Sequence, residues 1–357
     1  MFLKMDSDKL IKWYRSNKRD LPWRNTQDPY IIWISEILLQ QTRVAQGYGY
    51  FIRFTGRFPD VKTLAEAPED EVLKYWEGLG YYSRARNLHA AAKRIMTDFG
   101  GRFPESYADI RSLKGVGDYT AAAIVSFVWN QPYAVVDGNV YRVLSRIFGV
   151  DEPIDTGKGR KAFAELAMQI LNKKNPGEHN QALMEFGALQ CVPRNPDCSS
   201  CVFADTCLAY ATGQVAVLPQ KQGKTKVRPR FFHYFHVLVE DRIFLRRRPS
   251  GDIWQGLYEF PMIETTEEMD FAALKRSGAL DELFAGTEKL EVLEIISGIK
   301  HVLSHQILNA TFYRIRLYGA TDKLNAYQQI ISENLTDFAL PRLLHIYLEK
   351  SGGNLAK

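Results

Sequence analysis

The spacing of apolar residues changes once along the chain, near residue 210. Up to that point apolar residues recur every three or four positions, as on one face of an amphipathic helix, and no long stretch alternates with period two. From residue 231 onward the pattern alternates, most clearly over 232–239, 291–296 and 311–317, which predicts strands. The chain is therefore expected to be multidomain, with an all-α part followed by a mixed α/β part.

Start signals place several of the expected helices. Asp28 followed by Pro29 is an N-cap with proline at the first helical position, so a helix is expected over 29–42. Ser106 and Asp109 have the spacing of a capping pair. A run of small and apolar residues predicts a further helix over 119–129.

A short basic stretch separates the two parts. Residues 221–230 contain no acid and five cations, namely Lys221, Lys224, Lys226, Arg228 and Arg230. This composition is typical of an exposed linker. We expect a helical domain over 1–212, a basic interdomain linker over 213–230 and an α/β domain over 231–357.

Two glycines precede the helix expected over 119–129. Gly115 and Gly117 allow a tight turn that leaves the first N–H groups of the helix free to bind an anion such as a phosphate. The same glycines also suit a turn between packed helices for steric reasons alone. Asp137 follows the apolar pair Val135-Val136, so its carboxylate is expected at an element boundary close to this turn. The two features together suggest chemistry on a phosphate-bearing polymer.

Glu36 is unusual within its expected helix. The residues three and four positions away are mostly apolar, so its carboxylate shares an apolar face. Burial would raise the pKa of this carboxyl and suit it to act as a general acid near neutral pH. The alternative is a buried glutamate paired with an arginine.

The stretch 78–87 combines glycines, two tyrosines and two arginines. An exposed aromatic ring in such a loop can enter a base stack while the cations hold phosphates. Aromatic core packing with solvated arginines is the alternative.

Composition and charge add little to this picture. The 357 residues include 46 Lys and Arg against 41 Asp and Glu, and the net charge of +5 is compatible with a polyanionic partner. We find no targeting signal and no apolar run long enough to span a membrane, so an intracellular protein is expected, cytoplasmic if its source is prokaryotic.

All four cysteines fall within residues 191–207, spaced C-x6-C-x2-C-x5-C. Clustering of this kind favours a metal centre in a reducing compartment over a disulfide framework. Zinc sites usually contain two close pairs, and here only Cys198 and Cys201 form one. An iron–sulfur cluster fits the spacing better, although reduced structural thiols remain an alternative.

The order of Glu36, the Gly115/Gly117 turn, Asp137 and the cysteine loop resembles the iron–sulfur branch of the helix-hairpin-helix DNA glycosylase superfamily. Within that branch, endonuclease III-like enzymes carry a lysine two residues after the second glycine, where this chain has Tyr119. A phenol cannot form the Schiff base on which strand cleavage depends. The segment 35–44 also resembles adenine DNA glycosylases of the MutY type, which implies base removal without significant lyase activity.

Two segments of the second domain, 254–261 and 303–305, resemble the C-terminal module of those glycosylases. That module has a Nudix-like fold and recognises 8-oxoguanine. The domain lacks the glutamate-rich run that binds magnesium in Nudix hydrolases, so a recognition role is expected rather than hydrolysis. Leu303 departs from the family, where an aromatic residue is common, and this bears on the strength of 8-oxoguanine discrimination.

The resemblance also implies roles for individual residues. Glu36 would protonate adenine, and Asp137 would stabilise the sugar cation or trap it covalently before water arrives. Tyr119 and Asn139 would hydrogen-bond Asp137 and the reacting centre. By the same resemblance, Arg24 and Gln181 would contact adenine in its pocket, and Gln41 and Tyr81 would enter the base stack. Ser304 would recognise 8-oxoguanine, and Gly115 and Gly117 would hold a DNA phosphate. The cluster would be bound by Cys191, Cys198, Cys201 and Cys207.

We therefore expect a monomeric protein with a 4Fe-4S cluster that excises adenine opposite 8-oxoguanine or guanine in duplex DNA. Three other functions are compatible with parts of the pattern. They are a bifunctional endonuclease III-like glycosylase and lyase, a non-catalytic iron–sulfur DNA-binding protein, and a nucleotide pyrophosphohydrolase.

Overall fold

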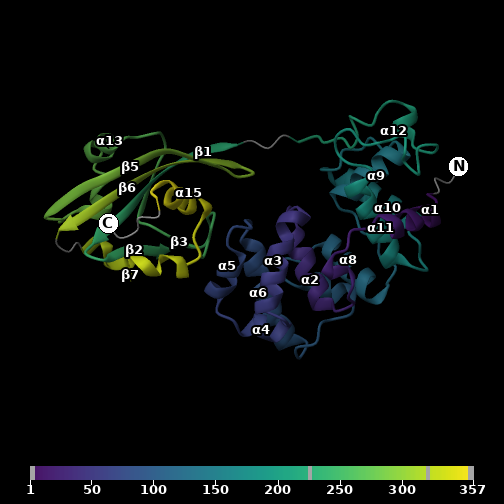
Figure 1. The fold of residues 1–357 in the computed structure, drawn as a ribbon, viewed down its shortest axis with the longest axis horizontal. Coiled ribbons are helices and arrows are strands. Elements are labelled where there is room, and N and C mark those ends of the chain that lie inside the picture. Colours follow the sequence, from purple (N-terminus) through teal and green to yellow (C-terminus); the bar gives the residue numbers. More distant parts are fainter. Residues whose placement is uncertain (1–4, 224–226, 319–321, 353–357) are drawn as a thin grey trace. The chain divides into compact units, whose positions relative to one another are not determined.

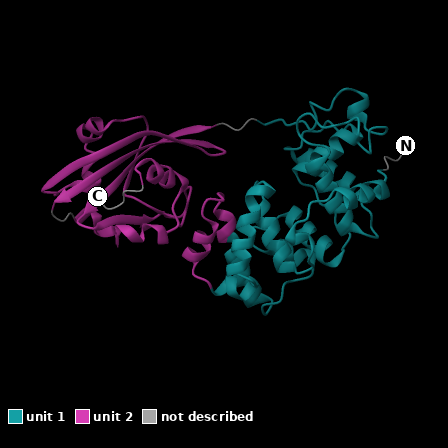
Figure 2. Ribbon diagram, viewed as in Figure 1, with its two compact units in different colours: residues 1–66, 87–224 teal, residues 67–86, 225–357 magenta. Residues whose placement is uncertain are grey.

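The computed structural model describes residues 5–223, 227–318 and 322–352. It consists of two compact units (Figure 2), one formed by Met1–Glu66 and Asn87–Lys224, the other by Ala67–Arg86 and Thr225–Lys357. The second unit thus includes a segment that the sequence pattern assigns to the helical domain. Lys224 and Lys226 of the predicted linker lie outside the described residues.

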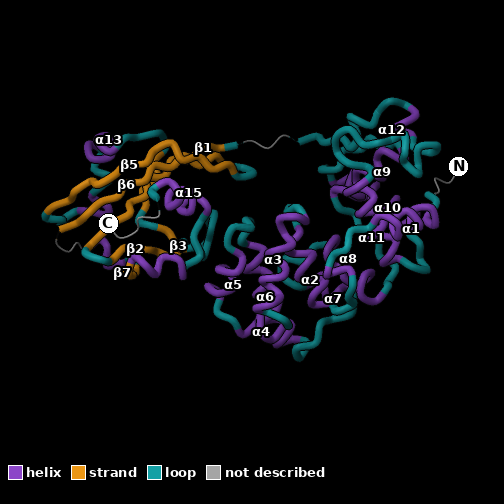
Figure 3. The backbone as a smooth tube through the Cα atoms, in the orientation of Figure 1, coloured by secondary structure: helices purple, strands orange, loops and turns teal. Residues whose placement is uncertain are grey.

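The first unit is built from helices, as predicted, and its described residues contain no strand (Figure 3). Its elements are α1 (Ser7–Asn17), η1 (Pro22–Arg24), α2 (Pro29–Leu39), α3 (Val44–Arg57), α4 (Val61–Glu66), most of α6 (Ser83–Asp98), α7 (Tyr107–Ser112), α8 (Asp118–Trp129), α9 (Gly138–Phe148), α10 (Gly157–Ile170), α11 (Pro176–Leu189) and α12 (Leu208–Ala211). No helix of the described chain is long and apolar enough to cross a membrane.

Local signals set several of these helix starts. Asp28 accepts a hydrogen bond from the backbone N–H of Tyr30 and caps α2, and Ser106 caps α7 by accepting from Asp109 N–H, as predicted. The helix that contains Glu36 ends at Leu39 and not at residue 42. Gln41 has a φ of 55°, a left-handed conformation that a helix cannot contain.

The Gly115/Gly117 turn joins α7 to α8. Gly115 has a φ of 81°, and a Cβ atom there would lie 2.7 Å from Cβ of Asn87, so both backbone conformation and space require glycine. Gly117 is the N-cap of α8. The prediction of a tight turn directly before a helix is confirmed.

Close packing also brings α11 against the start of α9. A Cβ atom at Gly187 would lie 2.7 Å from Cβ and 2.8 Å from the carbonyl oxygen of Asn139. Any larger residue at position 187 would force the two helices apart.

The second unit is a mixed α/β structure, as predicted. Its elements are α5 (Glu69–Trp76), β1 (Arg228–Val239), β2 (Arg242–Arg247), β3 (Tyr258–Glu259), β4 (Met262–Thr265), α13 (Phe271–Arg276), α14 (Asp281–Phe284), β5 (Lys289–Val302), β6 (Gln306–Tyr318), η2 (Asp322–Ala326), β7 (Gln328–Ile331), η3 (Ser332–Asp337) and α15 (Arg342–Lys350).

Its three long strands, β1, β6 and β5, are adjacent in the sheet, with β5 at the edge (Figure 1). The strand order is β3-β2-β1-β6-β5, with β4 paired to β1 and β7 to β2. The β1–β6 pair is parallel and the β5–β6 pair is antiparallel. Phe232 and Tyr234 pack with α15 on one face, whereas Phe235 and Val237 belong to a second apolar cluster. The short strands β4 and β7 were not predicted, because neither is long enough to show a period.

Arg230 corrects one expectation about the basic stretch. It was predicted to be exposed in the linker, but β1 begins at Arg228 and Arg230 is buried, with 6% of its surface exposed. Its guanidinium makes paired hydrogen bonds to the carboxylates of Asp252 and Glu264. These acids lie 22 and 34 residues further along the chain, so local composition could not reveal the pairing.

Candidate active site

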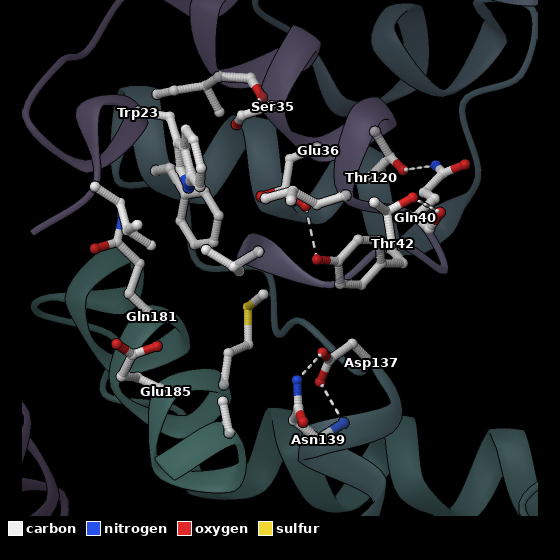
Figure 4. A pocket seen from close by; sticks show the side chains of 18 of the residues that line it. Trp23, Ser35, Glu36, Gln40, Thr42, Thr120, Asp137, Asn139, Gln181 and Glu185 are labelled. Atoms are coloured by element: carbon white, nitrogen blue, oxygen red, sulfur yellow. Dashed lines mark hydrogen bonds between the residues drawn. The ribbon is translucent and has the colours of Figure 1, made fainter. Parts of the chain in front are cut away.

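A pocket of about 620 Å³ opens in the first unit between α2, the turn before α8, the start of α9 and one face of α11 (Figure 4). It gathers nine residues that the sequence singled out, namely Arg24, Glu36, Gln41, Gly115, Gly117, Tyr119, Asp137, Asn139 and Gln181. Positions more than 150 residues apart in the sequence thus meet around one cavity. Their roles remain predictions.

Glu36 projects from α2 into this pocket, although only 8% of its surface is exposed. Burial is the main cause that raises the pKa of Glu36 to about 7, and the nearby carboxylate of Asp137 acts in the same direction. The hydrogen bond from Tyr119 and the charge of Arg24 act to lower it. The raised pKa expected from the apolar face is confirmed. At neutral pH this side chain exchanges readily between acid and carboxylate.

Asp137 lies at an element boundary, as predicted, and is the N-cap of α9. Its Oδ1 accepts hydrogen bonds from the backbone N–H groups of Asn139 and Val140, and its Oδ2 accepts one from the Asn139 side chain at 2.8 Å. Burial raises the pKa of Asp137, while these hydrogen bonds favour the ionised form. The cap therefore fixes the direction of the carboxylate and helps to keep it charged.

Tyr119 makes a different contact from the one expected. Its hydroxyl donates a hydrogen bond of 2.6 Å to Oε2 of Glu36, not to Asp137. Burial and the neighbouring carboxylates raise the pKa of Tyr119 well above its usual value, so the phenol keeps its proton. In Figure 4, dashed lines mark the hydrogen bond that Glu36 accepts and those that Asp137 accepts from Asn139.

Arg142 connects Asn139 to the cysteine loop. One guanidinium nitrogen donates to Oδ1 of Asn139 at 2.8 Å and to the carbonyl of Gly187, and Nε donates to the carbonyl of Cys191 at 2.7 Å. The amide that orients Asp137 is therefore itself oriented by Arg142. Sequence reasoning missed this residue, because a single arginine on an amphipathic helix carries no signal without its acceptors.

The opposite wall of the pocket contains an acid that sequence reasoning also missed. Glu185 is 1% exposed and accepts hydrogen bonds from the guanidinium groups of both Arg19 and Arg24. Burial alone would raise the pKa of Glu185, but these donors outweigh it and lower the pKa to about 2. Glu185 lies four positions after Gln181 among apolar residues, the same signal that drew attention to Glu36.

The four cysteines are free thiols and surround one small cavity, which they share with residues of α9 and α11. Arg146 donates to Sγ of Cys191, and the backbone N–H of Phe203 donates to Sγ of Cys201, both at 3.4 Å. Burial raises the pKa of Cys201 to about 11. Among the described residues, no group of three or more His, Cys, Asp and Glu side chains is arranged to hold a single metal ion.

The second unit has a pocket of its own, of about 600 Å³, to which two other predicted residues belong. Tyr81 and Ser304 line it, and their hydroxyl groups lie 3.0 Å apart. Tyr81 has a φ of 47° and is 48% exposed, so a strained backbone presents its ring to solvent. Leu303 and Trp254 also line this pocket.

Each of the two parts of the chain matches a known protein family. Residues 34–169 match the family described as HhH-GPD superfamily base excision DNA repair protein, and residues 233–350 match the NUDIX domain. The chain is 31% identical to the adenine DNA glycosylase of Buchnera aphidicola subsp. Acyrthosiphon pisum, over 98% of both proteins. The chain belongs to the adenine DNA glycosylase family.

Other members of the family show similar agreement. The adenine DNA glycosylase of Buchnera aphidicola subsp. Baizongia pistaciae is 35% identical, with 84% of this chain and 82% of that protein covered. The Homo sapiens adenine DNA glycosylase is 32% identical, with 87% and 67% covered. The chain is thus a DNA N-glycosylase by family.

Among solved structures, a thermostable thymine-DNA glycosylase is 32% identical, with a TM-score of 0.54 over 58% of this chain and 95% of that one. A non-covalent endonuclease III–DNA complex has a TM-score of 0.51 at 21% identity, over 58% of this chain and 94% of that one, which shows a shared fold.

Proposed function

We propose that this protein removes adenine paired with 8-oxoguanine or guanine in duplex DNA and leaves an abasic site. The observation that carries the proposal is the pairing of two carboxylates in one pocket, the buried Glu36 with a pKa near 7 and the half-buried Asp137 held by three N–H donors. One group can supply a proton while the other stays ionised. Two carboxylates with different pKa values are what acid-assisted cleavage of a glycosidic bond requires.

Binding would begin with extrusion of the target nucleotide, because a base inside a duplex is out of reach of these side chains. Gln41 and Tyr81 are the residues that we propose to enter the base stack. Both have positive φ values, 55° and 47°, and both are exposed. The Gly115/Gly117 turn at the start of α8 supplies backbone N–H groups for a DNA phosphate.

Glu36 then donates its proton to N7 of the extruded adenine, which makes the base a neutral leaving group. As the glycosidic bond breaks, positive charge develops on the sugar. Asp137 stabilises that charge, because its carboxylate is fixed by the N-cap geometry of α9. Water completes the reaction at the anomeric carbon and restores the proton to the site.

Tyr119 limits the chemistry to base removal. Its phenol keeps its proton and donates to Glu36, so this position offers no amine for a Schiff base with the sugar. The protein is therefore proposed to be monofunctional.

The pocket around Ser304 and Tyr81 is proposed to recognise the base opposite adenine. Ser304 supplies a hydroxyl that can donate to one atom and accept from another, next to the aromatic ring of Tyr81. An oxidised guanine differs from guanine at O8 and N7, one an acceptor and the other a donor, and such an edge suits a hydroxyl.

The four cysteines are proposed to hold a 4Fe-4S cluster. They surround a single cavity, and N–H donors already point at two of the sulfur atoms, as is usual around iron–sulfur clusters. The cluster would cross-link the loop at 191–207 to itself where it packs against residues of α9 and α11. Hydrolysis of a glycosidic bond needs no electron from it. Loading requires the thiols to lose their protons, and burial of Cys201 opposes this at that position.

The test is release of the free base from duplexes that carry adenine opposite 8-oxoguanine, adenine opposite guanine, adenine opposite thymine, and thymine opposite guanine. Adenine should be released from the first two and not from the others, and Glu36→Gln should abolish release while duplex binding is retained. Release of thymine but not adenine, or undiminished release by Glu36→Gln, would contradict the proposal.

A further inference from the structure

Tyr14 lies directly behind the wall of the active-site pocket and is not part of its lining. It is carried by α1 and is 2% exposed. Its hydroxyl donates a hydrogen bond of 2.8 Å to Oε1 of Gln181, and the guanidinium of Arg24 lies 5.8 Å from its ring centroid. Burial raises the pKa of the Tyr14 hydroxyl, so it remains a donor at neutral pH.

This contact decides what Gln181 can offer to a base in the pocket. An amide side chain has one accepting oxygen and two donating N–H groups. The oxygen of Gln181 is occupied by Tyr14, and this is the one hydrogen bond of the Gln181 side chain within the described parts of the chain. Its amide nitrogen is left to donate into the pocket that Gln181 lines.

Glu185, the acid next to Gln181, also has its acceptor oxygens engaged. Glu185 lies one turn after Gln181 on α11, beside it in Figure 4. Its two oxygens accept five hydrogen bonds in all, from the backbone N–H of Arg19 and from the guanidinium groups of Arg19 and Arg24. The side-chain oxygens of Gln181 and Glu185 are thus already engaged in hydrogen bonds.

We propose that Tyr14 is a positioning residue for base selection, which fixes the amide of Gln181 as a donor to a ring nitrogen of the extruded purine. The inference rests on the proposed function, in which N7 of adenine takes the proton from Glu36. The other ring nitrogens that accept hydrogen bonds are N1 and N3. A base with an N–H group at the position read by Gln181 would place a donor against the Gln181 donor and be rejected. Guanine has such an N–H group at N1.

The experiment compares wild-type protein with Tyr14→Phe in single-turnover base release opposite 8-oxoguanine. The substrates carry adenine, 1-deazaadenine or 3-deazaadenine. Each comparison uses two proteins on the same nucleotide, so differences in intrinsic glycosidic-bond stability cancel. Tyr14→Phe frees the Gln181 amide to turn, and adenine release should slow about tenfold, since one oriented hydrogen bond is worth about 1.4 kcal/mol.

On the deaza analogue that lacks the nitrogen read by Gln181, Tyr14→Phe should cost less than twofold, because the contact is already absent. On the other analogue the full tenfold loss should remain. Equal losses on all three substrates would indicate a merely structural role and overturn the proposal, as would unchanged adenine release.

Two controls separate this result from its alternatives. Gln181→Leu should reproduce the same dependence on the analogue, and the thermal midpoint of Tyr14→Phe reports whether the fold is intact. Failure of the proposed function would appear as absence of adenine release by the wild-type protein. Failure of the present inference would appear as wild-type adenine release that Tyr14→Phe slows by the same factor on adenine and on both deaza analogues.

Discussion

At the scale of single residues, the proton on Glu36 controls the chemistry. Its pKa of about 7 means that the acid form dominates below neutrality and is lost as pH rises. Asp137 must stay ionised, and burial raises its pKa, so activity is also lost at acid pH. We predict a bell-shaped dependence of the single-turnover rate on pH, with its basic limb near pH 7. A rate that keeps rising above pH 8 would exclude Glu36 as the proton donor.

Removal of the Tyr119 hydroxyl tests the assignment of Glu36 as the proton donor. Its hydrogen bond stabilises the carboxylate form of Glu36 and so lowers the pKa of Glu36. Removing the hydroxyl should raise that pKa, and Tyr119→Phe is predicted to shift the basic limb of the pH profile to higher pH. Tyr107→Phe is the matched control, because Tyr107 donates to Asp118 and does not line the pocket. Its profile should match the wild type.

At the scale of elements, one carboxylate both caps α9 and serves the proposed reaction. Asparagine is as good an N-cap as aspartate, so Asp137→Asn should abolish base release and leave the thermal midpoint almost unchanged. Asp137→Ala should lose base release and, in addition, about 1 kcal/mol of stability. Asp6→Ala, which removes the exposed cap of α1, should cost stability alone. Base release by Asp137→Asn at the wild-type rate would contradict the mechanism.

The elements also show what the sequence could predict. Local signals were sufficient where neighbours along the chain determine structure, as in the caps at Asp28 and Ser106, the turn at Gly115 and the burial of Glu36 on an apolar face. They failed where the decisive partner is distant. Arg230 reads as a linker cation until Asp252 and Glu264 are placed beside it. The roles of Arg142 and Glu185 likewise depend on distant partners. Arg142 donates to carbonyl groups 45 and 49 residues away, and Glu185 accepts from Arg19, 166 residues away.

At the scale of the whole molecule, the segment Ala67–Arg86 belongs to the same compact unit as the sheet. Glu77 is central to this arrangement, since it accepts hydrogen bonds from the backbone N–H of Leu340, from His345 and from Lys74. The segment also carries Tyr81, next to Ser304. The two residues proposed to probe the base opposite adenine are therefore held by one unit.

Loss of Glu77 should weaken that unit. Glu77→Ala leaves the N–H group of Leu340 without its acceptor, and we predict a loss of about 1–3 kcal/mol, measured as a lower thermal midpoint. Glu268→Ala, at an exposed loop position in the same unit, should leave the midpoint unchanged. An equal effect of the two substitutions would argue against a structural role for the Glu77 contacts.

This protein is proposed to break a glycosidic bond and to stop there, because the position two residues after Gly117 is a tyrosine. The most direct test incubates the protein with a strand-labelled duplex that carries adenine opposite 8-oxoguanine, and measures strand breakage with and without subsequent alkali. We predict that breakage appears only after alkali and grows in step with adenine release. Breakage at the same rate without alkali would contradict the central claim.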